Sequence, residues 1–245
     1  MAGYFTDKIH VLDGQAGPVY IIADTNAITL IDVGFPSDAK SIIMYVENTL
    51  KRKISQIKLI VITHSHFDHI SGVDYLMKKV DAHIAAHTSA EKYLTGKKAL
   101  PITSFSSYCS FLFFLFKNGF PLPSLQDIFS MPWSGIPGIK RGIKSGVKIW
   151  LEQGRAIPGL PGWEVFHTPG HTDDGICLYN PEEKILFSGD TIINDKGVLK
   201  LSRLLVWDKT ALQTSFKKIS QLQVNYLFPG WGPPVKGNDI LRDVR

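Results

Sequence analysis

Short apolar runs separated by polar segments predict strands in the first part of the chain. Residues 19–23 and 27–31 are two such runs, and residues 24–26 between them are typical of a tight turn. Residues 59–62 are apolar at every position, which indicates a strand buried on both faces, and residues 82–86 form another mostly apolar run. The pattern therefore predicts strands that lie inside a layered structure.

Helical periodicity occurs between these predicted strands. Ser37 or Asp38 is expected to cap a helix, because both precede a set of apolar residues at helical spacing. That set is Ile42, Ile43, Val46 and Leu50. A further helix is expected to begin near Asp68. Strands that alternate with helices predict a layered sheet fold.

A second run of strands is predicted in the later part of the chain. Residues 147–151, 163–167, 175–179 and 184–187 are the expected strands, and residues 180–183 are typical of a hairpin turn. We expect these strands to form a partner sheet that faces the first, with the helices outside. The predicted fold class is α+β, a four-layer αββα sandwich.

The pattern changes at about residues 95–148, which we interpret as an insertion in a single domain spanning residues 1–245. This segment is rich in proline and contains the aromatic run 111–116, which is too short to span a bilayer. Three uses of the run are open: packing on the body or in a homodimer, one wall of the substrate cleft, or contact with a membrane surface. Stable membrane insertion is not expected.

Composition is ordinary for a globular protein and narrows the location and partners. The 245 residues are 44% hydrophobic and 20% charged, and a chain of this length can bury a sizeable core. The only cysteines, Cys109 and Cys177, form no disulfide framework, and residues 1–10 lack the apolar core of a signal peptide, so we expect a cytoplasmic protein. The net charge of +5 comes from dispersed lysines, which does not favour a nucleic-acid partner.

Candidate chemistry concentrates where the strand at residues 59–62 ends. Three of the eight histidines, His64, His66 and His69, stand there with Asp68. Alternation along an extended backbone turns His64 and His66 to the same side. Imidazole and carboxylate groups together are ligands that suit zinc, iron or manganese.

Four segments, taken together, resemble the motifs of the metallo-beta-lactamase superfamily. Residues 64–69 match its His-x-His-x-Asp-His signature, and residues 30–34 resemble its early strand that ends in Asp-x-Gly. Residues 168–172 read Thr-Pro-Gly-His-Thr, and residues 187–191 contain Ser-Gly-Asp. The order and spread of these motifs imply the αββα fold of that family and a metal-dependent hydrolase.

The resemblance implies that His64, His66 and His171 hold one ion, because in the family the first two motif histidines and the Thr-Pro-Gly-His histidine share a metal. Three neutral imidazoles leave one tetrahedral position for water. His171 as an ordinary loop residue and Asp190 as a turn residue are the alternatives.

A second ion would use Asp68 and His69, with Asp190 bridging the two. Asp32 would hydrogen-bond the backbone or the histidines of the metal loop, or alternatively cap a neighbouring turn. His87 and His167 match no ligand position, so we expect both to be structural.

The chain departs from the family near its end. Residues 229–232 resemble the final Pro-Gly-His-Gly motif, but Trp231 stands in the histidine position, and indole has no lone pair to give a metal. No histidine follows His171. We therefore expect either a weaker second site or a single ion with Asp68 as the catalytic general base, and we expect Trp231 to fill the vacated volume. Zinc is the expected ion, with iron or manganese as alternatives.

The predicted function is hydrolysis of an ester-like carbonyl bond by metal-bound hydroxide, in a small-molecule thioester, lactone or lactam. One alternative is a phosphodiesterase of the same superfamily. Another is a metal-binding protein that has lost or altered its activity. The substrate and the oligomeric state do not follow from the sequence.

Overall fold

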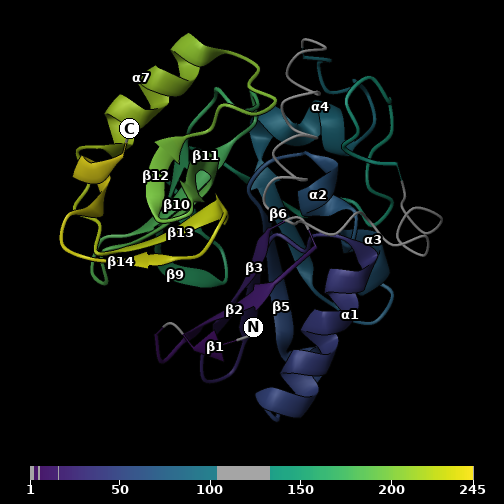
Figure 1. Cartoon of the computed structure of the whole chain (residues 1–245). Coiled ribbons are helices and arrows are strands. Elements are labelled where there is room, and N and C mark those ends of the chain that lie inside the picture. Colours follow the sequence, from purple (N-terminus) through teal and green to yellow (C-terminus); the bar gives the residue numbers. More distant parts are fainter. Residues whose placement is uncertain (1–2, 5, 16, 104–132, 245) are drawn as a thin grey trace.

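Two facing β-sheets form the centre of the computed structural model, which describes residues 3–4, 6–15, 17–103 and 133–244 (Figure 1). The first sheet has the order β1-β2-β3-β4-β5-β6-β7. Its strands are β1 (Gly3–Tyr4), β2 (Ile9–Asp13), β3 (Pro18–Ala23), β4 (Ile28–Ile31), β5 (Ile57–Ile62), β6 (His83–His87) and β7 (Ile149–Leu151). β1 to β4 pair in antiparallel fashion, whereas β4 to β7 are parallel.

The second sheet has the order β14-β13-β11-β10-β9-β8, with β12 also paired to β11. Its strands are β8 (Ala156–Ile157), β9 (Leu160–His167), β10 (Ile176–Asn180), β11 (Ile185–Asp195), β12 (Val198–Leu201), β13 (Tyr226–Trp231) and β14 (Val235–Lys236). Only β11 and β13 are parallel among these pairs. Each sheet is thus mixed, as Figure 1 shows.

Helices cover the outer face of each sheet (Figure 1). Those on the first sheet are α1 (Pro36–Met44), which continues as a π-helical turn at Tyr45–Thr49, α2 (Phe67–Ile70), α3 (Val73–Leu76) and α4 (Glu91–Leu94). Short 3-10 turns lie at Ile54–Gln56 and Thr88–Ala90. The second sheet is covered by α7 (Lys209–Ile219) and by a 3-10 turn at Ile240–Asp243.

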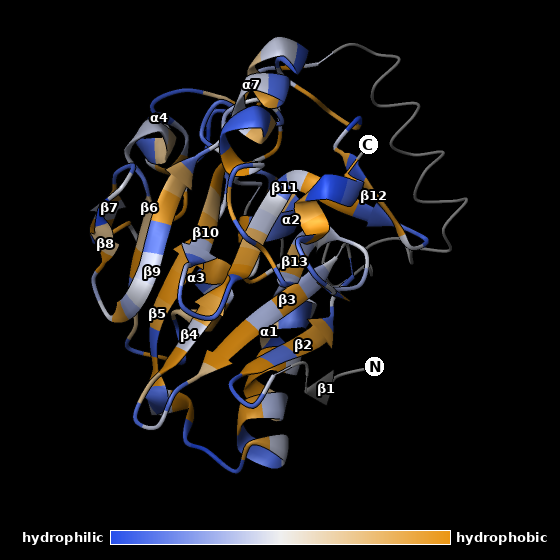
Figure 2. Cartoon of the chain, turned by 90° about the vertical axis from the view of Figure 1, so that its left-hand side faces the viewer, coloured by the Kyte–Doolittle hydropathy of each residue, from blue (hydrophilic) through white to orange (hydrophobic). Residues whose placement is uncertain are grey.

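Three buried hydrophobic clusters lie between the layers and account for their order. One joins the first sheet to its helices, one lies between the two sheets, and one joins the second sheet to α7. Along β5, Ile60 and Ile62 belong to the helix-facing cluster, whereas Leu59 and Val61 belong to the cluster between the sheets. The predicted strand buried on both faces and the predicted αββα sandwich are therefore confirmed, and Figure 2 shows the mostly hydrophobic strands.

Two predictions about elements were wrong. The segment at 147–151 was expected in the partner sheet, but β7 pairs parallel to β6 and completes the first sheet, because residues 88–148 return the chain to that edge. Helix α1 begins at Pro36, so Ser37 and Asp38 lie inside its first turn instead of capping it. There the Asp38 carboxylate accepts the Phe35 N–H at 2.8 Å.

The central part of the predicted insertion, residues 104–132 with the run 111–116 and Cys109, lies outside the described residues. The expected homodimer contact, cleft wall and membrane contact of that run stay predictions. In the part of the chain that the structure describes, no helix combines the length and the apolar character needed to cross a membrane.

Candidate metal centre

The loop after β5 supplies the first group of candidate ligands. His64 and His66 lie between β5 and α2, and His69 lies in α2. The start of α2 is fixed from outside the loop, because the Phe67 N–H donates to the Gly135 carbonyl at 3.1 Å. The parallel strand β5 therefore delivers these side chains to one end of the first sheet.

The second sheet supplies the other candidate ligands. His171 lies in the loop between β9 and β10, and Asp190 lies within β11. The pairing of β11 with β13 shifts register between Phe187 and Gly189, where Gly189 adopts a φ of 47°. A bulge of this kind re-aims the side chain that follows it, which here is Asp190.

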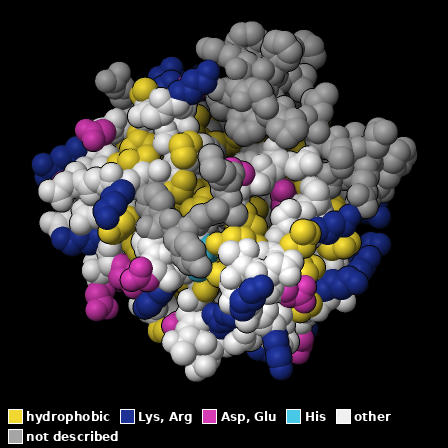
Figure 3. All heavy atoms as spheres, turned by 60° about the horizontal axis from the view of Figure 1, so that its bottom comes forward, with side chains coloured by type: hydrophobic (Ala, Val, Ile, Leu, Met, Phe, Trp, Pro, Cys, Tyr) yellow, Lys and Arg dark blue, Asp and Glu magenta, His cyan; other side chains and the backbone are white. Residues whose placement is uncertain are grey.

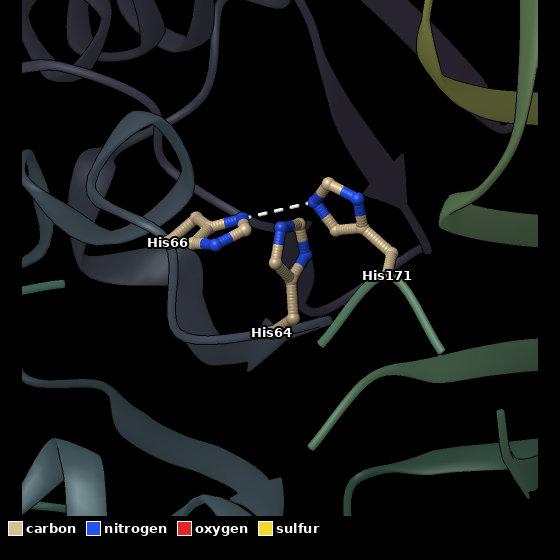
Figure 4. Close-up of side chains that lie close together, drawn as sticks. All are labelled: His64, His66 and His171. Atoms are coloured by element: carbon tan, nitrogen blue, oxygen red, sulfur yellow. Dashed lines mark hydrogen bonds between the residues drawn. The ribbon is translucent and has the colours of Figure 1, made fainter. Parts of the chain in front are cut away.

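These side chains converge from both sheets (Figure 4). Nδ1 of His66 lies 2.9 Å from Nε2 of His171, which in turn lies 3.2 Å from Oδ2 of Asp190. Nε2 of His69 lies 3.4 Å from Oδ1 of Asp190. Two sets of three buried donors have their ligand atoms within 4.8 Å of one another: His64, His66 and His171, and His64, His69 and Asp190.

Five of the six predicted ligands thus meet in three-donor sets, and Asp68 stands beside them. Its Oδ2 lies 3.8 Å from Nε2 of His69, but Asp68 is a member of neither set. The side chain is mostly buried, with 8% of its surface exposed. Asp68 is therefore placed to exchange protons near the donors without being gathered among them.

Unpartnered buried atoms show that the cluster fits a metal ion. Nε2 of His64 and Oδ1 of Asp190 are buried and have no hydrogen-bond partner among the described residues. Buried polar atoms are rarely left unsatisfied in folded proteins. An ion with imidazole and carboxylate preference would satisfy both atoms at once.

Burial keeps three of the imidazoles neutral. Burial lowers the pKa of His64 and of His66 well below the ordinary histidine value, and the neighbouring imidazoles lower both further. Burial also lowers the pKa of His171. Neutral imidazole has the free lone pair that a metal requires, so these three side chains are ready to bind without losing a proton.

The carboxylates and His69 form a charged group next to the neutral histidines. Burial favours neutral forms of both Asp190 and His69, but their attraction outweighs it, so the pKa of Asp190 is lowered to about 2 and that of His69 is raised. Burial raises the pKa of Asp68 to about 6, although His69 opposes the rise. Negative charge therefore stays at Asp190, where a dication would be attracted.

Asp32 holds the metal loop in place by three hydrogen bonds. Its Oδ1 accepts the Thr63 N–H at 2.8 Å, and its Oδ2 accepts the Thr63 hydroxyl at 2.6 Å. The same Oδ2 lies 2.8 Å from Nδ1 of His69. The prediction that Asp32 bonds the backbone and a histidine of the loop is confirmed, and these bonds direct Nε2 of His69 toward the cluster.

Trp231 fills the space beside Asp190, as predicted, and also makes a contact that the sequence did not reveal. Its side chain is buried, with 4% of the residue exposed. The indole Nε1–H donates to Oδ2 of Asp190 at 3.0 Å. Gly230 packs so closely that an added Cβ would overlap Oδ1 of Asp190. The carboxylate is therefore enclosed by an indole and by backbone on this side.

The loop that carries His171 is held by contacts that sequence reasoning missed. The Ser202 hydroxyl lies 3.3 Å from Nδ1 of His171, which leaves Nε2 to face the cluster. Trp207 donates its N–H to the His171 carbonyl at 3.0 Å, and Asp208 donates its N–H to the Gly170 carbonyl at 2.9 Å. No local pattern marks Ser202, because its role depends on β12 folding back beside the loop.

The two acidic residues after Thr172 also fasten this loop and are not metal donors, as expected. The Ser65 hydroxyl donates to Oδ2 of Asp174, which ties the two ligand-bearing loops together. Oδ2 of Asp173 accepts the Tyr93 hydroxyl at 2.9 Å and contacts the Lys92 ammonium group.

His87 and His167 stack on each other with ring centroids 4.2 Å apart, outside both donor sets. The stacked pair joins the end of β6 to the end of β9. The expectation that both are structural agrees with this arrangement.

Comparison with known proteins covers nearly the whole chain. A family model described as the metallo-beta-lactamase superfamily matches residues 12–231. The chain is 27% identical over 263 aligned residues to the probable metallo-hydrolase YflN of Bacillus subtilis (strain 168), with 99% of this chain and 91% of that protein covered.

Two further similarities bear on the fold and the chemistry. A hydroxyacylglutathione hydrolase of Francisella tularensis subsp. novicida (strain U112) is 29% identical over 175 residues, which cover 71% of this chain and 47% of that protein. The crystal structure of the BLEG-1 B3 metallo-beta-lactamase matches with a TM-score of 0.62 at 23% identity, covering 89% of this chain and 88% of that one. The structural match supports the four-layer fold.

Proposed function

Because the chain belongs to the metallo-beta-lactamase superfamily, we propose that it is a metallo-hydrolase whose substrate is a small molecule with an ester-like carbonyl bond, such as a thioester, lactone or lactam. The observation that carries the proposal is the convergence of His64, His66 and His171, three buried and neutral imidazoles, beside a buried carboxylate. Such a set leaves an open position on the ion it holds, which is the arrangement of catalytic sites.

Zinc is the ion we propose, held by these three imidazoles. When bound there, it would acidify a water molecule and polarise a carbonyl oxygen. Asp190 supplies negative charge beside the donors, with its orientation fixed by the Trp231 N–H. Asp68 is the proposed general base, because a carboxyl group whose pKa is about 6 can take and return a proton near neutral pH.

The surroundings and the relatives favour a carbonyl substrate over a phosphodiester. On the face shown in Figure 3, hydrophobic side chains surround a small patch of histidine surface, and Lys and Arg are dispersed among acidic groups. One relative is named for hydrolysis of hydroxyacylglutathione, and the structural neighbour is named as a beta-lactamase. The same reasoning supports the proposal that no nucleic acid is bound, and Cys177, a free buried thiol, is in keeping with a cytoplasmic location.

The proposal is tested by a substrate panel on protein stripped of metal and reloaded with zinc, manganese or iron. The panel contains chromogenic esters, thioesters, lactones, nitrocefin and phosphodiesters. We expect turnover of at least one carbonyl substrate that depends on the added ion. Turnover confined to the phosphodiesters would overturn the proposal.

The His66→Ala variant gives a sharper version of this test. Removal of one of the three imidazoles should abolish ion retention and reduce carbonyl turnover to background. The matched control is His83→Ala, which removes an exposed histidine at the start of β6 and should leave both unchanged. If His66→Ala keeps full turnover, the proposed mechanism is wrong.

A further inference from the structure

We propose that this chain holds one tightly bound divalent ion per molecule and not a pair, because its donors form two alternative sites that share one histidine. The inference deepens the proposed function, since it specifies the metal content of the same cluster. It is argued from the positions of His64, Asp190 and Trp231.

The first step is a count of lone pairs at His64. Both three-donor sets include this residue. Its Nδ1 lies 3.1 Å from the Thr63 hydroxyl, which leaves Nε2 as the nitrogen that faces the cluster. That nitrogen is buried and unpartnered. One neutral imidazole nitrogen donates one lone pair, so occupation of one set removes His64 from the other.

The second step concerns what remains for another ion. Without His64, the second set keeps only His69 and Asp190, 3.4 Å apart at their nearest ligand atoms. Asp68 approaches His69 but belongs to neither set. Two protein donors are fewer than the three that catalytic zinc sites ordinarily provide.

The third step is the role of Trp231, which closes the other side of Asp190. The indole N–H is only a donor, and at 3.0 Å it occupies Oδ2 of the carboxylate. The side chain is buried, so the position adjacent to Asp190 is filled by a ring that cannot bind a cation through nitrogen. Gly230 leaves no room for a donor side chain from the neighbouring position. The place from which β13 could complete a second site is therefore taken.

The expected difference in affinity between the two positions is large. Loss of an outer partner of a metal ligand alone weakens binding about 10–100-fold. Loss of a ligand should weaken it at least as much. We therefore expect any second ion to bind at least about 100-fold more weakly than the first.

The experiment measures metal content and affinity without using turnover. Purified protein is stripped with a chelator, reloaded with excess zinc, freed of loosely held ion by gel filtration, and analysed by elemental mass spectrometry. A chromogenic chelator that competes for zinc then gives the affinity of each ion. We expect one retained ion per chain in the wild type.

Two variants at one position separate ligand count from hydrogen bonding. Trp231→His adds an imidazole beside Asp190 and should raise the retained ions to two per chain. Trp231→Phe removes the N–H without adding a donor and should stay at one. If Trp231→His does not fold, the wild type and Trp231→Phe still decide the matter, because two tight ions in either would overturn the inference.

The remaining outcomes distinguish this inference from the proposed function. Two equally tight ions in the wild type would overturn the single-ion inference and leave metal-dependent hydrolysis standing. No retained ion in the wild type would overturn both. A folded Trp231→His variant that retains only one ion would show that position 231 does not limit the second site, which contradicts the third step.

Discussion

Asp174 is a buried carboxyl group, and its surroundings make stability depend on pH at the scale of one residue. Burial raises its pKa to about 6, even though the Ser65 hydroxyl donates to it. The folded protein therefore holds this proton to higher pH than the unfolded chain does. Its stabilising contribution is complete below about pH 4 and is lost as the pH rises through 6.

The Asp174→Asn variant should remove this dependence in metal-free protein. Asparagine keeps an acceptor for Ser65 but has no charge to bury. The free energy of unfolding of the variant, relative to the wild type, should rise by up to about 3 kcal/mol between pH 4 and pH 7, because one pKa unit is worth about 1.4 kcal/mol. Urea unfolding at three pH values measures the difference. Asp81→Asn, at an exposed position, controls for loss of a charge, and a difference that does not change with pH would contradict the prediction.

Individual residues of the site could be predicted only where a local motif carries them. The donors His64, His66 and His171 stand in recognisable segments, and the substitution at Trp231 is visible in the sequence. The bond from Trp231 to Asp190 could not be foreseen, because it depends on the parallel pairing of β11 with β13. Contacts of this kind join distant segments and leave no periodic trace.

Helix α7 acts as an anchor for the loop that carries His171, which is a property of the whole element. Asp208 caps the helix, with its carboxylate accepting the N–H groups of Thr210 and Ala211 at 2.8 and 2.9 Å. Within the helix, the Ser215 hydroxyl donates to the Pro169 carbonyl at 2.7 Å. The start of α7 and the site are therefore built together.

Asp208→Ala should destabilise the protein by about 1 kcal/mol, the usual cost of losing an N-cap carboxylate. Because the cap orders the segment that bonds Gly170 and His171, zinc affinity should fall as well. Chemical unfolding and a competitive zinc titration measure the two effects. Asp208→Asn keeps a capping oxygen and should change both only slightly; equal losses in the two variants would contradict the capping explanation.

The elements themselves were largely predictable, and the errors have physical causes. Apolar runs gave the strands, because burial imposes their composition, but a run does not specify its neighbour, and β7 was assigned to the wrong sheet. The strand β11 continues through the Ser-Gly-Asp segment, where a loop would be expected from glycine and serine. The bulge at Gly189 explains both the strand's continuation and the direction of Asp190.

At the scale of the whole molecule, the cluster between the sheets joins the two halves of the site. Tyr20 of β3 packs against Phe187 and Phe228 with ring centroids 5.2 and 5.3 Å apart. Its hydroxyl donates to the Pro229 carbonyl at 2.6 Å, one residue before Gly230. Packing between the sheets thus continues directly into the wall of the metal centre.

Phe228→Ala should lower the free energy of unfolding by about 3–5 kcal/mol, because it empties a fully buried position in this cluster. Residues 1–245 are proposed to be one domain, so both sheets should unfold in a single transition in the wild type and in the variant. Tryptophan fluorescence and circular dichroism, followed together in urea, test this. Separate transitions for the two signals would contradict the single-domain proposal. Phe228→Leu, which keeps most of the volume, is the matched control.

The division of donors between the sheets has a consequence for biogenesis. The first sheet, with His64 and His66, leaves the ribosome while the strands that carry His171 and Asp190 are still being made. Its inward apolar face is bare during that interval, which is when a chaperone would find a surface to bind. Metal uptake is accordingly a late step in the life of the nascent chain, and cellular zinc is captured only by molecules whose second half has already emerged and closed over the first.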